Sequence, residues 1–471
     1  MNWLLRLVVL TSAVAAPMEA LTAHAADPLQ AAVPPAPAAS SAEGLGHQLI
    51  GVVGCNAVSC HGGSSLVGGE AGAWQLRDTM HRRAYEILFN EVSVAMAKKL
   101  DLKNDKGEKI GAHQHARCLA CHSSSRDPKP NHGDRFAIEY GVGCESCHGA
   151  AGDWIAKHTT RTWKSLSTAQ KSDLGFRDLH SLTTRAETCV ACHIGSPAAT
   201  VDHDLIAAGH PRLAFEMSSF HSMLPRHWDA SAETQQDPGQ EIRLWAIGQA
   251  ASAKAMADIV GSRAKQAVRN EETHLLPDFA EFDCNACHHN LAEPTLGRPT
   301  LRQALGTPRW GSWSVPSAKF LAHGTASEKS LESLLEVMRQ SRLRSAPAGE
   351  VVTAAQRASD DLANWLHSQE HARYDAAHAS QLLHRVIDEK SDTQWQLNWD
   401  GQMQRFLAIA AASQSLQRLT GKTPFPPSSD SSALVPLRTR LKYRPDHATP
   451  PGYDPSEVDR ILADLRKSLV H

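Results

Sequence analysis

The sequence has no cysteine outside one repeated motif, no excess of charge of either sign, and no long apolar segment beyond its N-terminus. Its 48 basic and 50 acidic side chains leave a formal charge of −2 at pH 7, which does not indicate a nucleic acid or an anionic membrane surface as a partner. A membrane-spanning helix needs about 20 apolar residues, so no membrane span is expected after signal cleavage. No long segment alternates apolar and polar residues as a strand does, whereas apolar residues recur at helical spacing. The predicted fold class is therefore all-α.

The ten cysteines form five pairs, and a histidine directly follows the second cysteine of every pair. This is the attachment motif of c-type haem, in which both thiols bond to the porphyrin and the histidine becomes the proximal iron ligand. Four residues separate the first pair, whereas two separate each of the others. The sequence predicts five covalently bound c-type haems, at Cys55–Cys60–His61, Cys118–Cys121–His122, Cys144–Cys147–His148, Cys189–Cys192–His193 and Cys284–Cys287–His288.

Other uses of paired cysteines explain less of the pattern. A zinc knuckle needs two pairs that converge on one ion, and it does not require a histidine directly after each pair. Disulfides suit an exported protein, but they leave the histidines unexplained. Haem attachment accounts for both the cysteines and the histidines.

The N-terminus predicts export. Residues 1–25 resemble a signal peptide, with Arg6 near the start, an apolar run from Leu7 to Ala16, and Ala23-His24-Ala25 before the expected cleavage point. Residues 26–44 are rich in alanine, proline and serine and are predicted to be a disordered tether. Because c-type haem is attached outside the cytoplasmic membrane, the predicted compartment is the periplasm.

The remaining chain divides by composition. Residues 45–295 contain all five motifs and a helical pattern near 241–268, and are predicted to form a haem-packed cytochrome domain. Residues 296–471 contain no cysteine and are predicted to form a helical region that packs on the haem domain. One helix is expected near 402–419, and a proline-rich surface loop is expected over 421–452.

A polar segment of the C-terminal region carries several histidines. If residues 363–387 form one helix, four side chains lie near one face: His367, His371, Tyr374 and His378. Such a face suits a ligand for the fifth haem, a metal site or a substrate pocket, and it is equally typical of a solvated or interface face.

Histidines are abundant enough to supply a second ligand for every iron. The chain has 26 histidines, of which five follow cysteine pairs. Bis-histidine ligation gives lower potentials than ligation by histidine and methionine. His113 and His115 precede the second motif, and His289 follows the fifth, so each is a further candidate ligand.

Several segments resemble the nitrifier tetrahaem cytochrome c-554 family. The third motif lies in GVGCESCHG, residues 141–149, with His158 ten residues past the proximal histidine. The stretch WQLRDTMHRRAYEIL, residues 74–88, is similar to that family's helix after the first haem. The second and fourth motifs match in order, and the resemblance covers about residues 50–215.

The resemblance implies haems in stacked pairs, three of them six-coordinate and the second five-coordinate. It also implies that His81 and His158 are distal ligands. His210, in Ala208-Gly209-His210-Pro211, is the preferred candidate for the third distal ligand, and His180 is the rival.

Two functions follow. The first, which we favour, is a periplasmic pentahaem cytochrome that relays electrons between redox proteins. The second is a haem enzyme with an open iron at the second motif, acting on nitric oxide, hydroxylamine, nitrite or peroxide. The sequence cannot decide between them, because an open iron is the absence of a residue.

Overall fold

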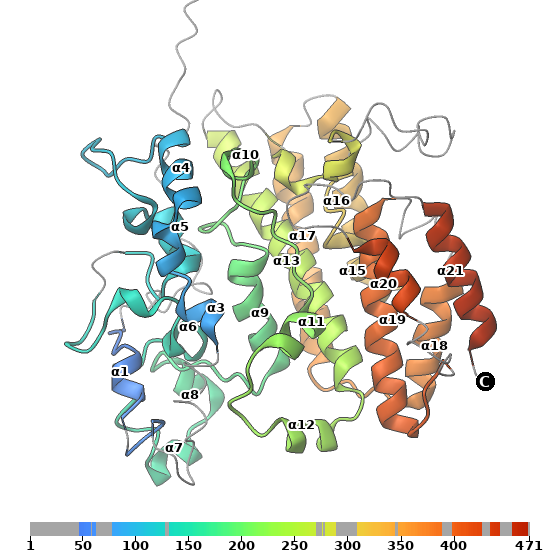
Figure 1. Cartoon of the computed structure of the whole chain (residues 1–471), viewed down its shortest axis with the longest axis horizontal. Coiled ribbons are helices and arrows are strands. Elements are labelled where there is room, and N and C mark those ends of the chain that lie inside the picture. The colour runs from blue at the N-terminus through green and yellow to red at the C-terminus, as the bar shows by residue number, and fades with distance from the viewer. Residues whose placement is uncertain are drawn as a thin grey trace, which may run out of the picture. The chain divides into compact units, whose positions relative to one another are not determined.

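The computed structural model describes residues 47–57, 59–62, 78–127, 131–269, 276, 278–288, 309–343, 347–388, 398–425, 434–442 and 455–469. The predicted signal peptide, the predicted tether and His289 lie outside these ranges. Within them the secondary structure is helical, and β-type pairing is limited to isolated bridges (Figure 1). The predicted all-α fold class is confirmed.

The part of the chain that carries the first four motifs is built from short helices joined by irregular segments. Many of these helices start at a side chain that accepts a backbone N–H; Asn90, for example, accepts from Ser93 N at 2.7 Å. The helices in this part are α1 (Val52–Cys55), α3 (Thr79–Arg82), η2 (Glu86–Phe89), α4 (Glu91–Lys99), η3 (Ala112–Gln114), α5 (Ala116–His122), η4 (Ile138–Tyr140), α6 (Cys144–His148), α7 (Arg161–Ser165), α8 (Thr168–Ser172), α9 (Leu182–His193), α10 (His203–Ala208), α11 (Met217–Met223) and α12 (Ala230–Gln236).

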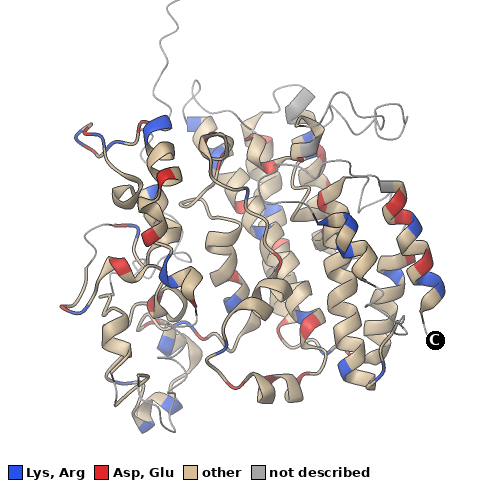
Figure 2. Cartoon of the chain, in the orientation of Figure 1, with Lys and Arg blue, Asp and Glu red and all other residues tan. Residues whose placement is uncertain are grey.

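Longer helices follow. The helical pattern near 241–268 is confirmed as α13 (Gln240–Arg269), and the one near 402–419 as α19 (Trp399–Thr420), which ends at the left-handed Gly421. The other elements of this part are η5 (Phe279–Glu281), η6 (Cys284–Ala286), α15 (Val315–Leu321), α16 (Ala326–Leu343), α17 (Ala348–Gln369), α18 (Ala376–Asp388), α20 (Val435–Leu441) and α21 (Pro455–Ser468). Acidic and basic residues are interspersed over these helices (Figure 2).

Helix α13 joins the two parts predicted from composition. It packs most extensively along α17 and also contacts α9, α11, α15 and α19. Small residues allow this close approach, since a Cβ on Gly261 would lie 3.1 Å from the Cβ of Ala355. One hydrophobic cluster contains buried residues from α9, α13, α16 and α17, so the core continues across position 295.

The last helices form a second hydrophobic cluster with α13, and they correct one prediction. The segment 421–452, expected to be a surface loop, contains α20. Proline is compatible with the first turn of a helix, and α20 has Pro436 there. Leu437 and Leu441 are buried in this cluster, which explains why the helix forms despite its proline-rich surroundings.

The single helix considered over 363–387 does not form. Helix α17 ends at Gln369 and α18 begins at Ala376, so the intervening turn separates His367 from His378. Glu370 instead caps another helix, because its carboxylate accepts the N–H groups of Leu182 and Thr183 at 3.0 Å each. The four side chains therefore do not share one helix face.

Candidate haem-binding sites

We number the sites 1 to 5 in chain order of their cysteine motifs. At sites 2, 3 and 4 the motif ends a helix, because α5, α6 and α9 each finish at the motif histidine. Cysteines three residues apart then lie on one side of the helix, next to the histidine. Site 1 differs, since α1 ends at Cys55 and a turn carries Cys60 and His61. Site 5 begins in the short helix η6.

Each motif histidine faces a second histidine at nearly the same distance. The ring centres are 6.2 Å apart for His61–His158, 6.3 Å for His122–His210, 6.2 Å for His148–His227, 6.1 Å for His81–His193 and 6.3 Å for His203–His288. The structure thus places all three predicted distal candidates, His81, His158 and His210, beside motif histidines. Sequence reasoning missed His203 and His227, which have no local motif.

This spacing fits a six-coordinate iron between two imidazoles. A coordinating imidazole nitrogen lies about 2.0 Å from its metal and about 1.1 Å from its ring centre, so the two ring centres would be about 6.2 Å apart. Two imidazole rings that merely pack against each other can adopt other separations, so packing alone does not explain why the same distance recurs at five places. The donor set at every site therefore suits a bis-histidine haem that is bonded to the adjacent cysteines.

Hydrogen bonds fix the orientation of several of these rings. The Nδ1 atoms of His122, His158 and His210 lie 2.8, 2.5 and 2.8 Å from the carbonyl oxygens of Ala84, Ile155 and Pro211, respectively. An Nδ1–H that donates to such an oxygen leaves Nε2 free as the metal-binding atom.

His81 has a different partner. Its Nδ1 lies 2.6 Å from Oδ2 of Asp78, which also caps α3 by accepting the His81 backbone N–H. Asp78 is buried, with an exposed fraction of 4%. Burial disfavours the charged form of His81, but the hydrogen bond and the negative charge of Asp78 outweigh it and raise the pKa of His81.

Burial favours the neutral form of several other paired histidines. It lowers the pKa of His148 and of His193 to about 4, with nearby cationic groups as a smaller cause. The pKa values of His61 and His122 are also lowered, mainly by burial. Neutral imidazole is the form that binds a metal.

Contacts between the motif regions show which sites are neighbours. Helix α1, which ends at Cys55 of site 1, contacts α6, which carries Cys144 of site 3. The Sγ of Cys192 at site 4 lies 3.9 Å from the carbonyl oxygen of Ala120 at site 2, to which it donates. Ser146 of site 3 and Cys192 of site 4 line the same pocket. Sites 1 and 3 are therefore adjacent, as are sites 2 and 4, and site 3 lies close to site 4.

The other histidines named from the sequence do not face a motif histidine. His180 is almost fully exposed and pairs with Asp178 at 2.9 Å. His113 stacks on Phe89 with ring centres 4.3 Å apart, and His115 caps α5. His378 pairs with Asp375 at 2.8 Å. Within the described ranges, no group of three or more histidine, cysteine, aspartate or glutamate side chains is arranged to hold a metal ion.

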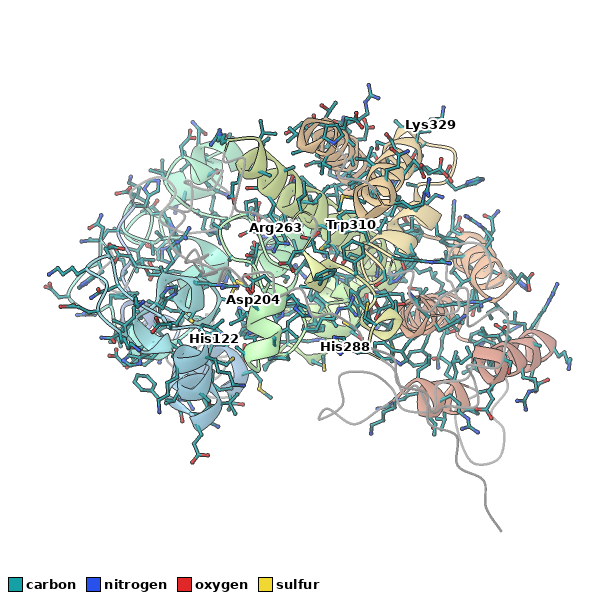
Figure 3. The ribbon with its side chains drawn as sticks, turned by 90° about the horizontal axis from the view of Figure 1, so that it is seen from above. His122, Asp204, Arg263, His288, Trp310 and Lys329 are labelled. Carbon is teal, nitrogen blue, oxygen red and sulfur yellow. The ribbon has the colours of Figure 1, made fainter. Side chains whose placement is uncertain are left out.

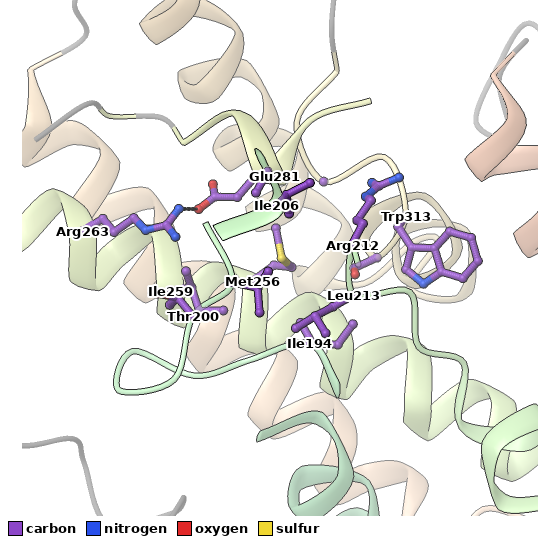
Figure 4. A pocket seen from close by; sticks show the side chains of 14 residues that line it. Ile194, Thr200, Ile206, Arg212, Leu213, Met256, Ile259, Arg263, Glu281 and Trp313 are labelled. Atoms are coloured by element: carbon purple, nitrogen blue, oxygen red, sulfur yellow. Dashed lines mark hydrogen bonds and ion pairs between the residues drawn. The ribbon is translucent and has the colours of Figure 1, made fainter. Parts of the chain in front are cut away.

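A pocket lies between α10, α13 and the segment before site 5 (Figure 4). Its walls include the apolar side chains of Ile206, Leu213 and Met256. Arg263 pairs with Glu281 at one side, as Figure 4 shows. None of the residues that line this pocket is a motif cysteine or a paired histidine.

Residues 54–149 match the family model described as "Cytochrome c554 and c-prime". This segment is similar to a c-type cytochrome of that family. The match begins directly before Cys55 and ends directly after His148, so it contains the first three motifs and His81. It confirms the predicted resemblance over this segment and supports covalently bound haem and electron transfer.

No curated protein and no solved structure matches the chain. The fourth and fifth motifs and the helices from α13 onward lie outside the family match. Among the described residues, no helix is long and apolar enough to cross a membrane.

Proposed function

We propose that this chain is a periplasmic pentahaem cytochrome that relays single electrons between redox proteins, with two histidines ligating every iron. The observation that carries the proposal is the pairing of each motif histidine with a second histidine at 6.1–6.3 Å. A bound haem supplies one-electron chemistry, because its iron cycles between the ferric and ferrous states. The chain supplies ten thiols and ten imidazoles, and burial lowers the pKa of six of those imidazoles.

The ligand pairs of the proposal follow from the ring contacts. The proximal and distal residues are His61 and His158 at site 1, His122 and His210 at site 2, His148 and His227 at site 3, His193 and His81 at site 4, and His288 and His203 at site 5. Hydrogen bonds from Nδ1 to carbonyl groups or to Asp78 help to hold four of these rings, and a held ligand reduces the rearrangement that accompanies electron transfer.

The enzyme alternative rests on an open iron at site 2. His210 lies opposite His122 with ring centres 6.3 Å apart, and its Nδ1 is directed to the Pro211 carbonyl oxygen. Because Nε2 of His210 is available to bind the iron, it would occupy the coordination position that a substrate needs. The geometry therefore favours electron transfer over catalysis at this site.

The experiment that tests the proposal is electron paramagnetic resonance of the oxidised holoprotein, produced in a host that attaches c-type haem. We expect low-spin ferric signals that account for five haems per chain, and a mass that equals the processed chain plus five haems. A high-spin signal of about one haem per chain would contradict the proposal and support the enzyme.

Single-ligand variants extend this test to individual sites. His81→Ala and His158→Ala should each retain five haems by mass and convert one iron to high spin. The matched control is His180→Ala, because His180 is exposed and faces no motif histidine. A ligand variant with an unchanged spectrum would disprove that ligand pair alone.

A further inference from the structure

Helix α10 carries a paired histidine at each of its ends. His203 is its first residue and lies 6.3 Å, ring centre to ring centre, from His288 of site 5. His210 follows the helix by two residues and lies 6.3 Å from His122 of site 2. Figure 3 labels His122 and His288, with Asp204 of α10 between them. One short helix therefore serves two sites whose motifs are far apart in the sequence.

The two histidines are close along the chain. They are seven residues apart, which corresponds to about 10 Å at the helical rise of about 1.5 Å per residue. Gly209, at φ 131°, ends the helix and turns the chain into His210. Side chains of Val92 and Met96 from α4 lie within 4 Å of a Cβ placed on Gly209, so the turn is packed against its neighbours.

Polar contacts tie α10 to both sites. Asp202, its N-cap, forms an ion pair at 2.5 Å with Arg117, the residue before Cys118 of site 2. The His203 backbone N–H donates to Oδ1 of Asp278 at 3.1 Å, and Asp278 starts the segment that leads into site 5. The first turn of α10 is thus held by both motif regions.

At the other end, Lys99 of α4 donates to the carbonyl oxygen of Ala208 at 3.0 Å. The helix is therefore anchored at both termini. Side-chain contacts, in addition to the backbone connections, hold it in place relative to site 2. An anchored helix keeps the two ligand histidines at a constant separation.

The geometry points to site 5 as the direct neighbour of site 2, at one end of the row of haem sites. Helix α10 supports the second histidine of both sites. This inference rests on the proposed function. The contacts between motif regions relate site 1 to site 3, site 3 to site 4 and site 4 to site 2, so α10 completes a single row of sites that ends at sites 1 and 5. Cys60 and Cys287, at these two ends, are the exposed members of the ten cysteines, and the other eight are partly buried.

Redox titration monitored by electron paramagnetic resonance tests the inference. The signal of site 2 is assigned as the one altered in His210→Met, and that of site 1 as the one altered in His158→Met. The test variant is Cys284→Ala with Cys287→Ala, which removes the fifth haem. We expect the midpoint potential of site 2 to shift more than that of any other site, because neighbouring charges interact most strongly at short distance.

A second variant keeps the fifth haem in place. His203→Met gives site 5 a histidine–methionine ligand pair and raises its potential, so site 5 is reduced before site 2. The electron on the reduced site 5 adds a negative charge beside site 2. This charge should shift the midpoint potential of site 2 to a lower value and leave that of site 1 unchanged. His378→Met is the control, because His378 is exposed and faces no motif histidine, and all five titrations should match the wild type.

The outcomes separate this inference from the proposed function. A wild-type mass with fewer than five haems would reject the proposed function before any titration. With five haems present, a largest shift at site 1, 3 or 4, or no shift in either variant, would overturn the placement of site 5 beside site 2.

Discussion

Replacing Asp78 with asparagine is expected to raise the midpoint potential of the haem at site 4. The Asp78 carboxylate is buried and lies 2.6 Å from Nδ1 of His81, whose ring faces His193. A carboxylate partner increases the basicity of a ligand histidine, and it stabilises the more positive ferric iron. Asparagine keeps a hydrogen-bond acceptor at this position but removes the negative charge.

The size of the effect follows from the geometry. Crossing the hydrogen bond, the imidazole ring and an iron–nitrogen bond of about 2.0 Å puts the carboxylate about 7 Å from the iron. A unit charge at about 7 Å in an effective dielectric of about 20 interacts by about 2 kcal/mol. For a one-electron couple, at about 59 mV per tenfold change, this corresponds to an increase of about 100 mV.

The assay is a redox titration of the low-spin signal that disappears in His81→Ala. Asp178→Asn is the matched control, because Asp178 also pairs with a histidine, His180, that is exposed and faces no motif histidine. We expect no change of any potential in the control. An increase below about 30 mV in Asp78→Asn, or an equal increase at another site, would refute the reasoning.

Three further predictions concern ligation and packing. Imidazole added in solution should restore the low-spin spectrum of His158→Ala, because it can replace the lost ligand. A high-spin spectrum unchanged by imidazole would count against ligation by His158. Gly248→Ala should lower the free energy of unfolding by about 1–3 kcal/mol in a denaturant titration, since its Cβ would lie 2.1 Å from that of Met217. Gly349→Ala, with nothing within 4 Å, is the control and should be neutral or stabilising. Burial raises the pKa of Glu216 from 4.5 to about 7, so wild-type stability should fall as pH rises through this range, and Glu216→Gln should not show this fall.

Local sequence patterns predicted some helices correctly but missed a break between two others. Helices α13 and α19 were predictable because their apolar residues recur at helical spacing and α19 ends at a glycine that adopts the left-handed conformation. The break between α17 and α18 was not predictable from spacing alone. Glu370 leaves the helical path there to cap α9, and that contact joins residues 188 positions apart.

The sequence alone also suggested a boundary near position 295, because cysteine content changes there. In the folded chain, α13 and α17 share one hydrophobic cluster, and apolar side chains from both sides of that position fill it. Amino-acid composition describes what each segment contains, but it does not show which helix faces pack together. A change of composition therefore need not mark a break in the hydrophobic core.

By itself, the sequence determined the attachment motifs and the candidate proximal histidines, because thiols and imidazole must lie within a few residues of each other to share one haem. Only the tertiary structure decided which histidine stands opposite each of them. His227 is 79 positions from its partner His148, and His203 is 85 positions from His288. A distal ligand needs a distance of about 6 Å in space and no fixed spacing along the chain, so the packing of α10 and its neighbours had to supply it.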